Sequence, residues 1–238
     1  MNKDTLLEIH DLKKTFQLYM QNRTIHACKG ISLTLQKGSF VGITGKSGSG
    51  KSTILKGIYR TNLPQGGHIY YDSEAFGVID LCTISERMMI YLRKFELGYV
   101  SQFLNIMPRT TAREIVELAL MDMGVSKEEA SKEAIRMLTH FELDASLWDM
   151  YPNTFSGGEK LRLNIAAAMV KKPRLLLLDE PTASLDNASK IKVRELIEQL
   201  KREGTTMLGI FHDLEFMEGL CDYEFNMNKG MMKYDQSC

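Results

Sequence analysis

The segment FVGITGKSGSGKST, residues 40–53, decides the fold of this 238-residue chain. It opens with a short run of apolar and β-branched residues, which is typical of a buried strand. It continues as G-x-x-x-x-G-K-S, the pattern of a phosphate-binding loop that joins a strand to a helix. The glycines permit positive φ and close backbone approach, so successive N–H groups can surround phosphate oxygens at the helix N-terminus. Residues 40–53 therefore predict a strand, a phosphate loop and a helix, in that order.

Two side chains of this loop have chemistry of their own. The Lys51 ammonium can reach the β- and γ-phosphates of a nucleotide, and the Ser52 hydroxyl can ligate Mg²⁺. A Gly/Ser turn without a ligand has the same composition, but the strand before the loop and the helix-compatible segment after it favour nucleotide binding. The residues expected to surround the nucleotide are Gly45, Lys46, Ser47, Gly48, Ser49, Gly50, Lys51, Ser52 and Thr53.

Strands and helices alternate along the rest of the chain. Brief apolar runs at 97–101, 174–178 and 206–211 predict buried strands, because they are bounded by glycine or polar turns. Residues 187–203 carry apolar side chains at the period of a helix, and the pattern stops at Gly204. This alternation predicts an α/β fold with a largely parallel sheet.

The pattern changes between residues 108 and 140, where two consecutive amphipathic segments predict a pair of helices. Strand-like segments resume only later, so the helical part interrupts the sheet rather than following it. The chain length suits one core with an inserted subdomain. We therefore expect a single domain over residues 1–238, with a core of 1–102 and 161–238 and a helical subdomain of about 103–160.

An acidic pair follows the apolar run at 175–178. Asp179 and Glu180 fall at the carboxyl end of a predicted parallel strand, which is where open α/β sheets hold their ligands. In phosphoryl transfer, such a pair can hold the Mg²⁺ shell and orient and deprotonate the attacking water. A buried strand that ends in a solvated Asp-Glu-Pro turn is common by itself. Together with the phosphate loop, the pair predicts Asp179 at the metal and Glu180 as the catalytic base.

The segment SGGE, residues 156–159, fits two interpretations. Ser-x-x-Glu is a capping box, which predicts a helix that starts here and runs to about Val170. A capped helix with two glycines at its entrance also presents N–H groups and the positive end of its dipole to an anion. The motif alone does not choose between a helix cap and a phosphate contact.

The composition excludes several classes of function. The 30 Lys and Arg residues balance 30 Asp and Glu residues, so the chain lacks the net charge that attracts nucleic acid or anionic lipid. Its 44% hydrophobic and 25% charged residues are typical of a globular domain. The longest apolar runs are far shorter than the ~18 residues of a membrane-spanning helix. The four cysteines form no C-x-x-C pair, which predicts reduced thiols in a cytoplasmic protein rather than a zinc site.

In their order, these motifs resemble the ATP-binding cassette (ABC) ATPase family over almost the whole chain. The resemblance implies a P-loop NTPase fold with an ABC-type nucleotide-binding core and an inserted helical subdomain. It implies ATP and Mg²⁺ as ligands, and a second cassette as partner in a homo- or heterodimer closed by ATP. The family's signature motif corresponds to Ser156, Gly157, Gly158 and Glu159, with Phe155 in place of the usual Leu and Glu159 in place of the usual Gln. Ala167 stands where the following helix usually carries Arg.

The resemblance also assigns roles to isolated residues. Gln102 corresponds to the Q-loop glutamine, which links Mg²⁺ and the nucleophilic water to the helical subdomain, and His212 corresponds to the switch histidine at the γ-phosphate. Residues 184–186 resemble the D-loop. Phe16 either stacks on adenine or is an ordinary strand residue, and Tyr19 is a lesser candidate for stacking. The implied catalytic residues are Glu180, His212, Gln102 and Lys51, and the implied metal-site residues are Ser52, Gln102 and Asp179.

Within the family, three stretches look like an ATP-binding subunit of the bacterial carbon–phosphorus lyase system: residues 98–103 with 106–109, residues 156–159 with 164–166, and residues 209–213. That resemblance implies a soluble ATPase that supports conversion of alkylphosphonate to a ribosyl triphosphate phosphonate, with lyase subunits as partners. Two alternatives stay open. The chain can be the ATPase of a lipoprotein-releasing or macrolide-exporting transporter, whose helical subdomain receives a coupling helix of a permease. It can also be a nucleotide-gated scaffold with little turnover.

Overall fold

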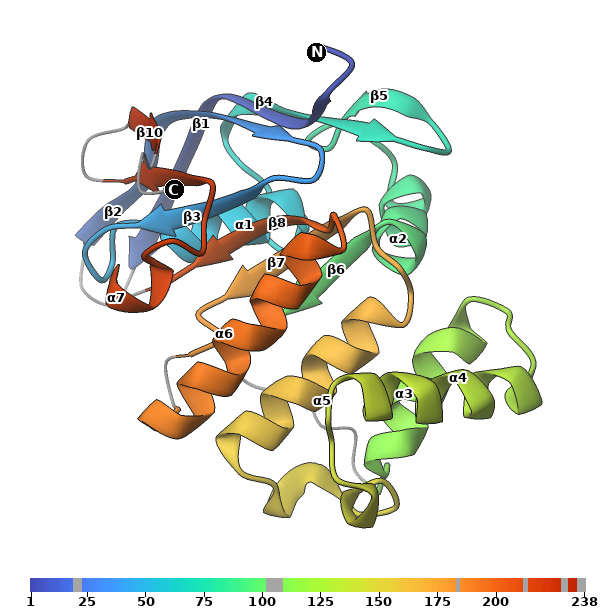
Figure 1. Ribbon diagram of the computed structural model, residues 1–238. Coiled ribbons are helices and arrows are strands. Elements are labelled where there is room, and N and C mark those ends of the chain that lie inside the picture. Colours follow the sequence, from blue (N-terminus) through green and yellow to red (C-terminus); the bar gives the residue numbers. More distant parts are fainter. Residues whose placement is uncertain (19–22, 102–108, 183–184, 212–213, 228–230, 235–238) are drawn as a thin grey trace.

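The strand before the phosphate loop lies inside a six-stranded sheet of the computed structural model (Figure 1). The structure describes residues 1–18, 23–101, 109–182, 185–211, 214–227 and 231–234. The strands are β1 Thr5–Leu18, β2 Arg23–Gln36, β3 Phe40–Thr44, β4 Gly66–Ser73, β5 Gly77–Asp80, β6 Leu97–Val100, β7 Leu175–Asp179, β8 Thr206–Ile210, β9 Tyr223–Asn226 and β10 Met231–Tyr234. The helices are α1 Lys51–Ile58, α2 Glu86–Phe95, α3 Ala112–Asp122, α4 Lys127–His140, α5 Gly157–Met169, α6 Asn187–Arg202 and α7 Leu214–Met217. Two short 3₁₀ turns follow α4, at Ala145–Leu147 and Pro152–Thr154.

The six-stranded sheet has the order β10-β9-β3-β8-β7-β6 within the described residues. Every neighbouring pair is parallel except β10 and β9. Residues of β3 and β8 are buried throughout, and so are the four leucines of β7. Strands with both faces covered are continuous apolar runs rather than alternating ones, which is why the sequence pattern found them. The predicted α/β class and largely parallel core sheet are confirmed.

A second sheet has the order β2-β1-β4-β5 and is antiparallel. The sequence analysis did not predict it. Its long strands contain register shifts, for example between Ile9 and Leu12, which break the alternation of apolar and polar residues that marks a half-buried strand. Helix α1 lies between the two sheets, where its buried Ile54 and Ile58 share a core cluster with Ile9 and Val41. This packing holds the start of α1, and therefore the phosphate loop, against both sheets.

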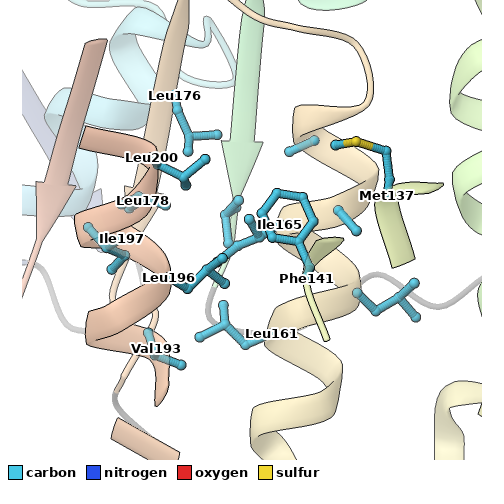
Figure 2. Packing of buried hydrophobic residues seen from close by; sticks show 14 of the residues in the cluster. Met137, Phe141, Leu161, Ile165, Leu176, Leu178, Val193, Leu196, Ile197 and Leu200 are labelled. Carbon is cyan, nitrogen blue, oxygen red and sulfur yellow. The ribbon is translucent and has the colours of Figure 1, made fainter. Parts of the chain in front are cut away.

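The other face of the parallel sheet is covered by helices. Helix α5 lies between α6 on one side and α3 and α4 on the other (Figure 1). Figure 2 shows Ile165 of α5 beside Phe141 on one side and Leu196 of α6 on the other, in a single buried cluster. The two helices expected between residues 108 and 140 are α3 and α4, and the expected helix after Ser156 is α5. The subdomain boundary of about 103–160 stays a proposal.

Candidate nucleotide site

The phosphate loop connects β3 to α1 in a conformation that needs glycine. Gly50 is the N-cap residue of α1 and has φ +92°, in the left-handed region. A Cβ atom added to Gly50 would lie 1.9 Å from the Ala27 carbonyl oxygen of β2, so no side chain fits there. No side chain of the described residues caps the first turn of α1. The Thr53 N–H donates to the Gly50 carbonyl at 3.0 Å, and the N-terminus of the helix can also bind an anion.

Two side chains of the loop, those of Lys51 and Ser49, carry buried polar groups. Lys51 is only 4% exposed, and its ammonium donates to the carbonyl oxygens of Gly45 and Lys46 at 2.8 and 3.2 Å. Burial lowers the pKa of Lys51, and the charge of Glu180 acts in the opposite direction. The Ser49 hydroxyl is buried and has no hydrogen-bond partner among the described residues. A buried ammonium, an unpaired hydroxyl and a glycine cradle fit the phosphate groups of ATP.

A cavity of about 230 Å³ adjoins the loop and brings together residues distant in sequence. Phe16 of β1 lines it opposite the loop, and Glu180 lines it as well. Pairing of β1 with β2 sets Phe16 opposite Ile25, which lines the cavity beside Ala27. The sequence analysis missed Ile25 and Ala27, because only the strand pairing shows that they border the loop. Adenine stacking by Phe16 stays a proposal.

The acidic pair lies at the end of β7, as the strand pattern predicts. Glu180 follows the strand with φ +53°, and its main-chain N–H donates to the Ile210 carbonyl of β8 at 3.2 Å. Left-handed backbone at a non-glycine residue costs about 1–2 kcal/mol, and such strain concentrates at functional sites. The conformation sets Glu180 at the cavity wall.

Asp179 has a partner that the motif analysis missed. Its Oδ2 atom accepts a 2.6 Å hydrogen bond from the hydroxyl of Tyr99 on the neighbouring strand β6. Burial raises the pKa of Tyr99 far above its ordinary value, and the hydrogen bond to Asp179 adds to this. The Tyr99 hydroxyl therefore keeps its proton and acts as the donor.

The segment 156–159 forms the predicted capping box. The Glu159 main-chain N–H donates to the Ser156 hydroxyl at 3.3 Å, and the Glu159 carboxylate accepts from the Ser156 N–H at 2.7 Å. Ser156 and Gly157 are exposed at the N-terminus of α5. Neither these residues nor Gly158 and Glu159 are among the described residues that line the cavity at the phosphate loop. Within one chain, the structure does not bring the signature segment to that cavity.

Four residues with implied or candidate roles, Tyr19, Gln102, Ser184 and His212, lie outside the described residues. The structure does describe Asp186, the last residue of the segment that resembles the D-loop. Asp186 caps α6 by accepting from the Ser189 N–H at 2.8 Å, and this hydrogen bond lowers the pKa of Asp186.

Across the described ranges, no helix has the length and apolar character needed to cross a bilayer.

Comparison with known proteins places this site in a family. A model of the family "ABC transporter" matches residues 28–183, which is more than half of the chain. The chain belongs to the ABC transporter ATP-binding family. As an ABC cassette it is an ATPase, with ATP and Mg²⁺ as its ligands. The family and the fold inferred from the motifs are therefore confirmed.

Relatives of the cassette include several transporter proteins. The chain is 34% identical to the uncharacterized ABC transporter ATP-binding protein MJ0796 of Methanocaldococcus jannaschii, over 88% of each chain. It is 33% identical to the lipoprotein-releasing system ATP-binding protein LolD of Aquifex aeolicus, over 90% of each chain. It is 34% identical to the macrolide export ATP-binding/permease protein MacB of Brucella abortus, over 90% of this chain but only 32% of that protein.

A solved structure of MJ0796 resembles the whole cassette. It is the dimeric post-hydrolysis state bound to ADP and Pi, and it superposes with a TM-score of 0.85 at 30% identity, covering 96% of this chain and 98% of that one. The likeness covers nearly the whole of both chains, so the described elements share the fold of that cassette.

Proposed function

We propose that this chain is the ATP-hydrolysing subunit of an ABC transporter of the lipoprotein-releasing or macrolide-exporting type. The observation that carries the ATPase part is a cavity lined by the phosphate loop, Phe16 and Glu180. The observation that favours transport is the set of relatives named above, which includes LolD and MacB. The permease partner and the transported substrate class belong to this proposal.

The residues proposed for the site have separate tasks. Lys51 and the N-terminus of α1 bind the β- and γ-phosphates, while Phe16 stacks on the adenine ring. Glu180 orients the attacking water and accepts its proton. Ser52 and Asp179 would hold Mg²⁺, which would supply neutralisation of the charge on the phosphate oxygens. Gln102 and His212 complete the site in this proposal.

A second cassette completes the composite site. One chain has one phosphate loop and one signature segment, and the capping box at Ser156 does not line the loop cavity of its own chain. The exposed N-terminus of α5 is therefore free to meet the ATP of a partner cassette, in a homo- or heterodimer. The dimeric MJ0796 structure supports this arrangement.

A soluble subunit of the carbon–phosphorus lyase system, resembling PhnL, is the second candidate. Three stretches of sequence favour it: residues 98–103 with 106–109, residues 156–159 with 164–166, and residues 209–213. None of the relatives named above is a lyase subunit, and the names LolD and MacB favour transport instead. A nucleotide-gated scaffold is the third candidate, and measured ATP turnover separates it from the other two.

Purification from the native host distinguishes the two enzymatic candidates. We expect affinity-tagged Glu180→Gln protein to be recovered in the membrane fraction with a polytopic permease in the presence of ATP. Tagged Lys51→Ala protein is the matched control, because it should lose the ATP-dependent association. Recovery with soluble lyase subunits, together with failure of a deletion strain to grow on phosphonate as sole phosphorus source, would reject transport in favour of the lyase system.

A further inference from the structure

Strands β6 and β7 pair in parallel at one end of the core sheet, and their side chains meet at its carboxyl edge. The register sets Tyr99 opposite Leu177, two residues before Asp179. The Tyr99 ring nevertheless reaches the end of β7, because its hydroxyl lies 2.6 Å from Asp179 Oδ2. This contact joins Tyr99, three residues before the proposed Q-loop glutamine, to the carboxylate proposed for the metal site.

The Tyr99 ring is held by its neighbours. Tyr59, the C-cap residue of α1, packs against it with ring centroids 4.9 Å apart. The Arg93 guanidinium of α2 lies 5.1 Å from the centre of the Tyr59 ring, and its Nε donates to the Tyr59 carbonyl at 2.9 Å. Packing from α1 and α2 therefore fixes the position from which the hydroxyl of Tyr99 donates.

A hydrogen bond to a carboxylate is short and roughly twice as strong as one between neutral groups. The hydrogen bond from the Tyr99 hydroxyl to Oδ2 restricts rotation of the Asp179 carboxylate. The same hydrogen bond does not engage the other carboxylate oxygen, Oδ1. A metal shell benefits from a ligand group held in one orientation, and partners that orient such groups commonly change metal affinity by about 10–100-fold.

We propose that Tyr99 is a positioning residue for the Asp179 carboxylate and sets the Mg²⁺ dependence of ATP binding. The inference rests on the proposed nucleotide site and adds a role for Tyr99, to which the sequence resemblance assigned none. Tyr99 acts through Asp179 and is not expected to touch the nucleotide.

Tyr99→Phe tests the proposal, because it removes the hydroxyl and keeps the ring. Tyr59→Phe is the matched control, because it removes a hydroxyl from the same aromatic pair and leaves the donor to Asp179 in place. A fluorescent ATP analogue is titrated against each protein in EDTA and across a Mg²⁺ series, and Mn²⁺ binding is followed by EPR. We expect Tyr99→Phe to bind nucleotide like wild type in EDTA and to need about tenfold more Mg²⁺ or Mn²⁺ for half-saturation. Tyr59→Phe should match wild type in both conditions.

A double-mutant cycle separates positioning from a general effect on the fold. In an Asp179→Asn background, Tyr99→Phe should no longer shift the metal dependence, because the charged partner is already gone. An unchanged Mg²⁺ dependence in Tyr99→Phe would overturn the proposal. Equal loss of affinity with and without metal would also overturn it, because the hydroxyl would then act on the whole site. If ATP affinity of the wild-type protein did not respond to Mg²⁺, the proposed function would fail together with this inference.

Discussion

The side-chain amide of Asn164 donates a 3.1 Å hydrogen bond to the main-chain carbonyl of Ser101. Asn164 lies in α5, the helix that begins at the signature segment, and Ser101 follows β6 and directly precedes Gln102. The bond therefore joins the signature helix to the start of the proposed Q-loop. Two segments with implied nucleotide contacts are connected through one side chain.

Asn164→Ala should uncouple these segments. Loss of one side-chain bond to a main-chain carbonyl should lower the free energy of unfolding by about 1 kcal/mol. We expect kcat for ATP hydrolysis to fall several-fold while ATP affinity stays near wild type, because Asn164 does not line the nucleotide cavity. Denaturant unfolding and steady-state kinetics measure both quantities. Asn153→Ala, at an exposed position just before the same helix, is the control, and an equal effect of both substitutions would contradict this role.

Glu180→Gln should keep ATP binding but slow hydrolysis by at least ~100-fold, the lower limit for loss of a general base. The trapped ATP should then hold two cassettes together, so the variant should shift from monomer to dimer in size-exclusion chromatography when Mg²⁺ and ATP are added. Wild-type turnover in the Glu180→Gln protein would rule out Glu180 as the base.

Ser156→Arg in the Glu180→Gln background should abolish the ATP-dependent dimer, because it places a bulky side chain at the exposed start of α5. The substitution also removes a capping box. Thr111→Arg is the matched control, since Thr111 and Glu114 form the same capping box at the start of α3. If Thr111→Arg prevented the dimer equally well, the effect would belong to lost helix stability rather than to the composite site.

Lys51→Met should stabilise the nucleotide-free protein while weakening ATP binding. Burial lowers the pKa of Lys51 from its ordinary 10.5, so the folded state disfavours the charged ammonium. This cost is fully present below the folded-state pKa and disappears as the pH rises through that value toward 10.5, where the folded protein releases the proton before the unfolded chain does. The difference in unfolding free energy between variant and wild type should therefore be largest near neutral pH and shrink in alkaline buffer. A difference independent of pH would show that the charge is not its cause.

Gly50→Ala should disrupt the phosphate loop, because the new Cβ would lie 1.9 Å from the Ala27 carbonyl. Gly48→Ala is the control, because Gly48 also has positive φ, +77°, but a Cβ there meets nothing within 4 Å. The control should lose about 1–2 kcal/mol of stability from backbone strain alone. Gly50→Ala should lose more stability than Gly48→Ala, as followed by thermal unfolding. Both glycines line the nucleotide cavity, so stability and not ATP affinity is the quantity compared. Similar losses in the two variants would refute the contact between the loop and β2.

Local patterns in the sequence were sufficient for the phosphate loop, for the core strands β3, β6, β7 and β8 and for helices α1, α3, α4, α5 and α6, but not for β9 or α2. The run 40–53 predicted β3, the loop and α1 because each rule involved is local: buried strands are continuous apolar runs, and a glycine-rich turn before a helix binds phosphate. The apolar side chains at helical period in residues 187–203 and the capping box at Ser156 are local patterns too, because each depends on residues only three or four apart.

Only the tertiary structure decided which distant side chains meet. The pairing of Phe16 with Ile25 at the cavity follows from the register of β1 on β2, and the bulges in those strands hide that register from the sequence pattern. The contact of Tyr99 with Asp179 joins residues 80 positions apart. It depends on the order of strands in the sheet, which the core as a whole determines through packing of the two sheets around α1. Local propensity carries no information about such contacts, because they form only when separate elements bury their apolar faces against one another.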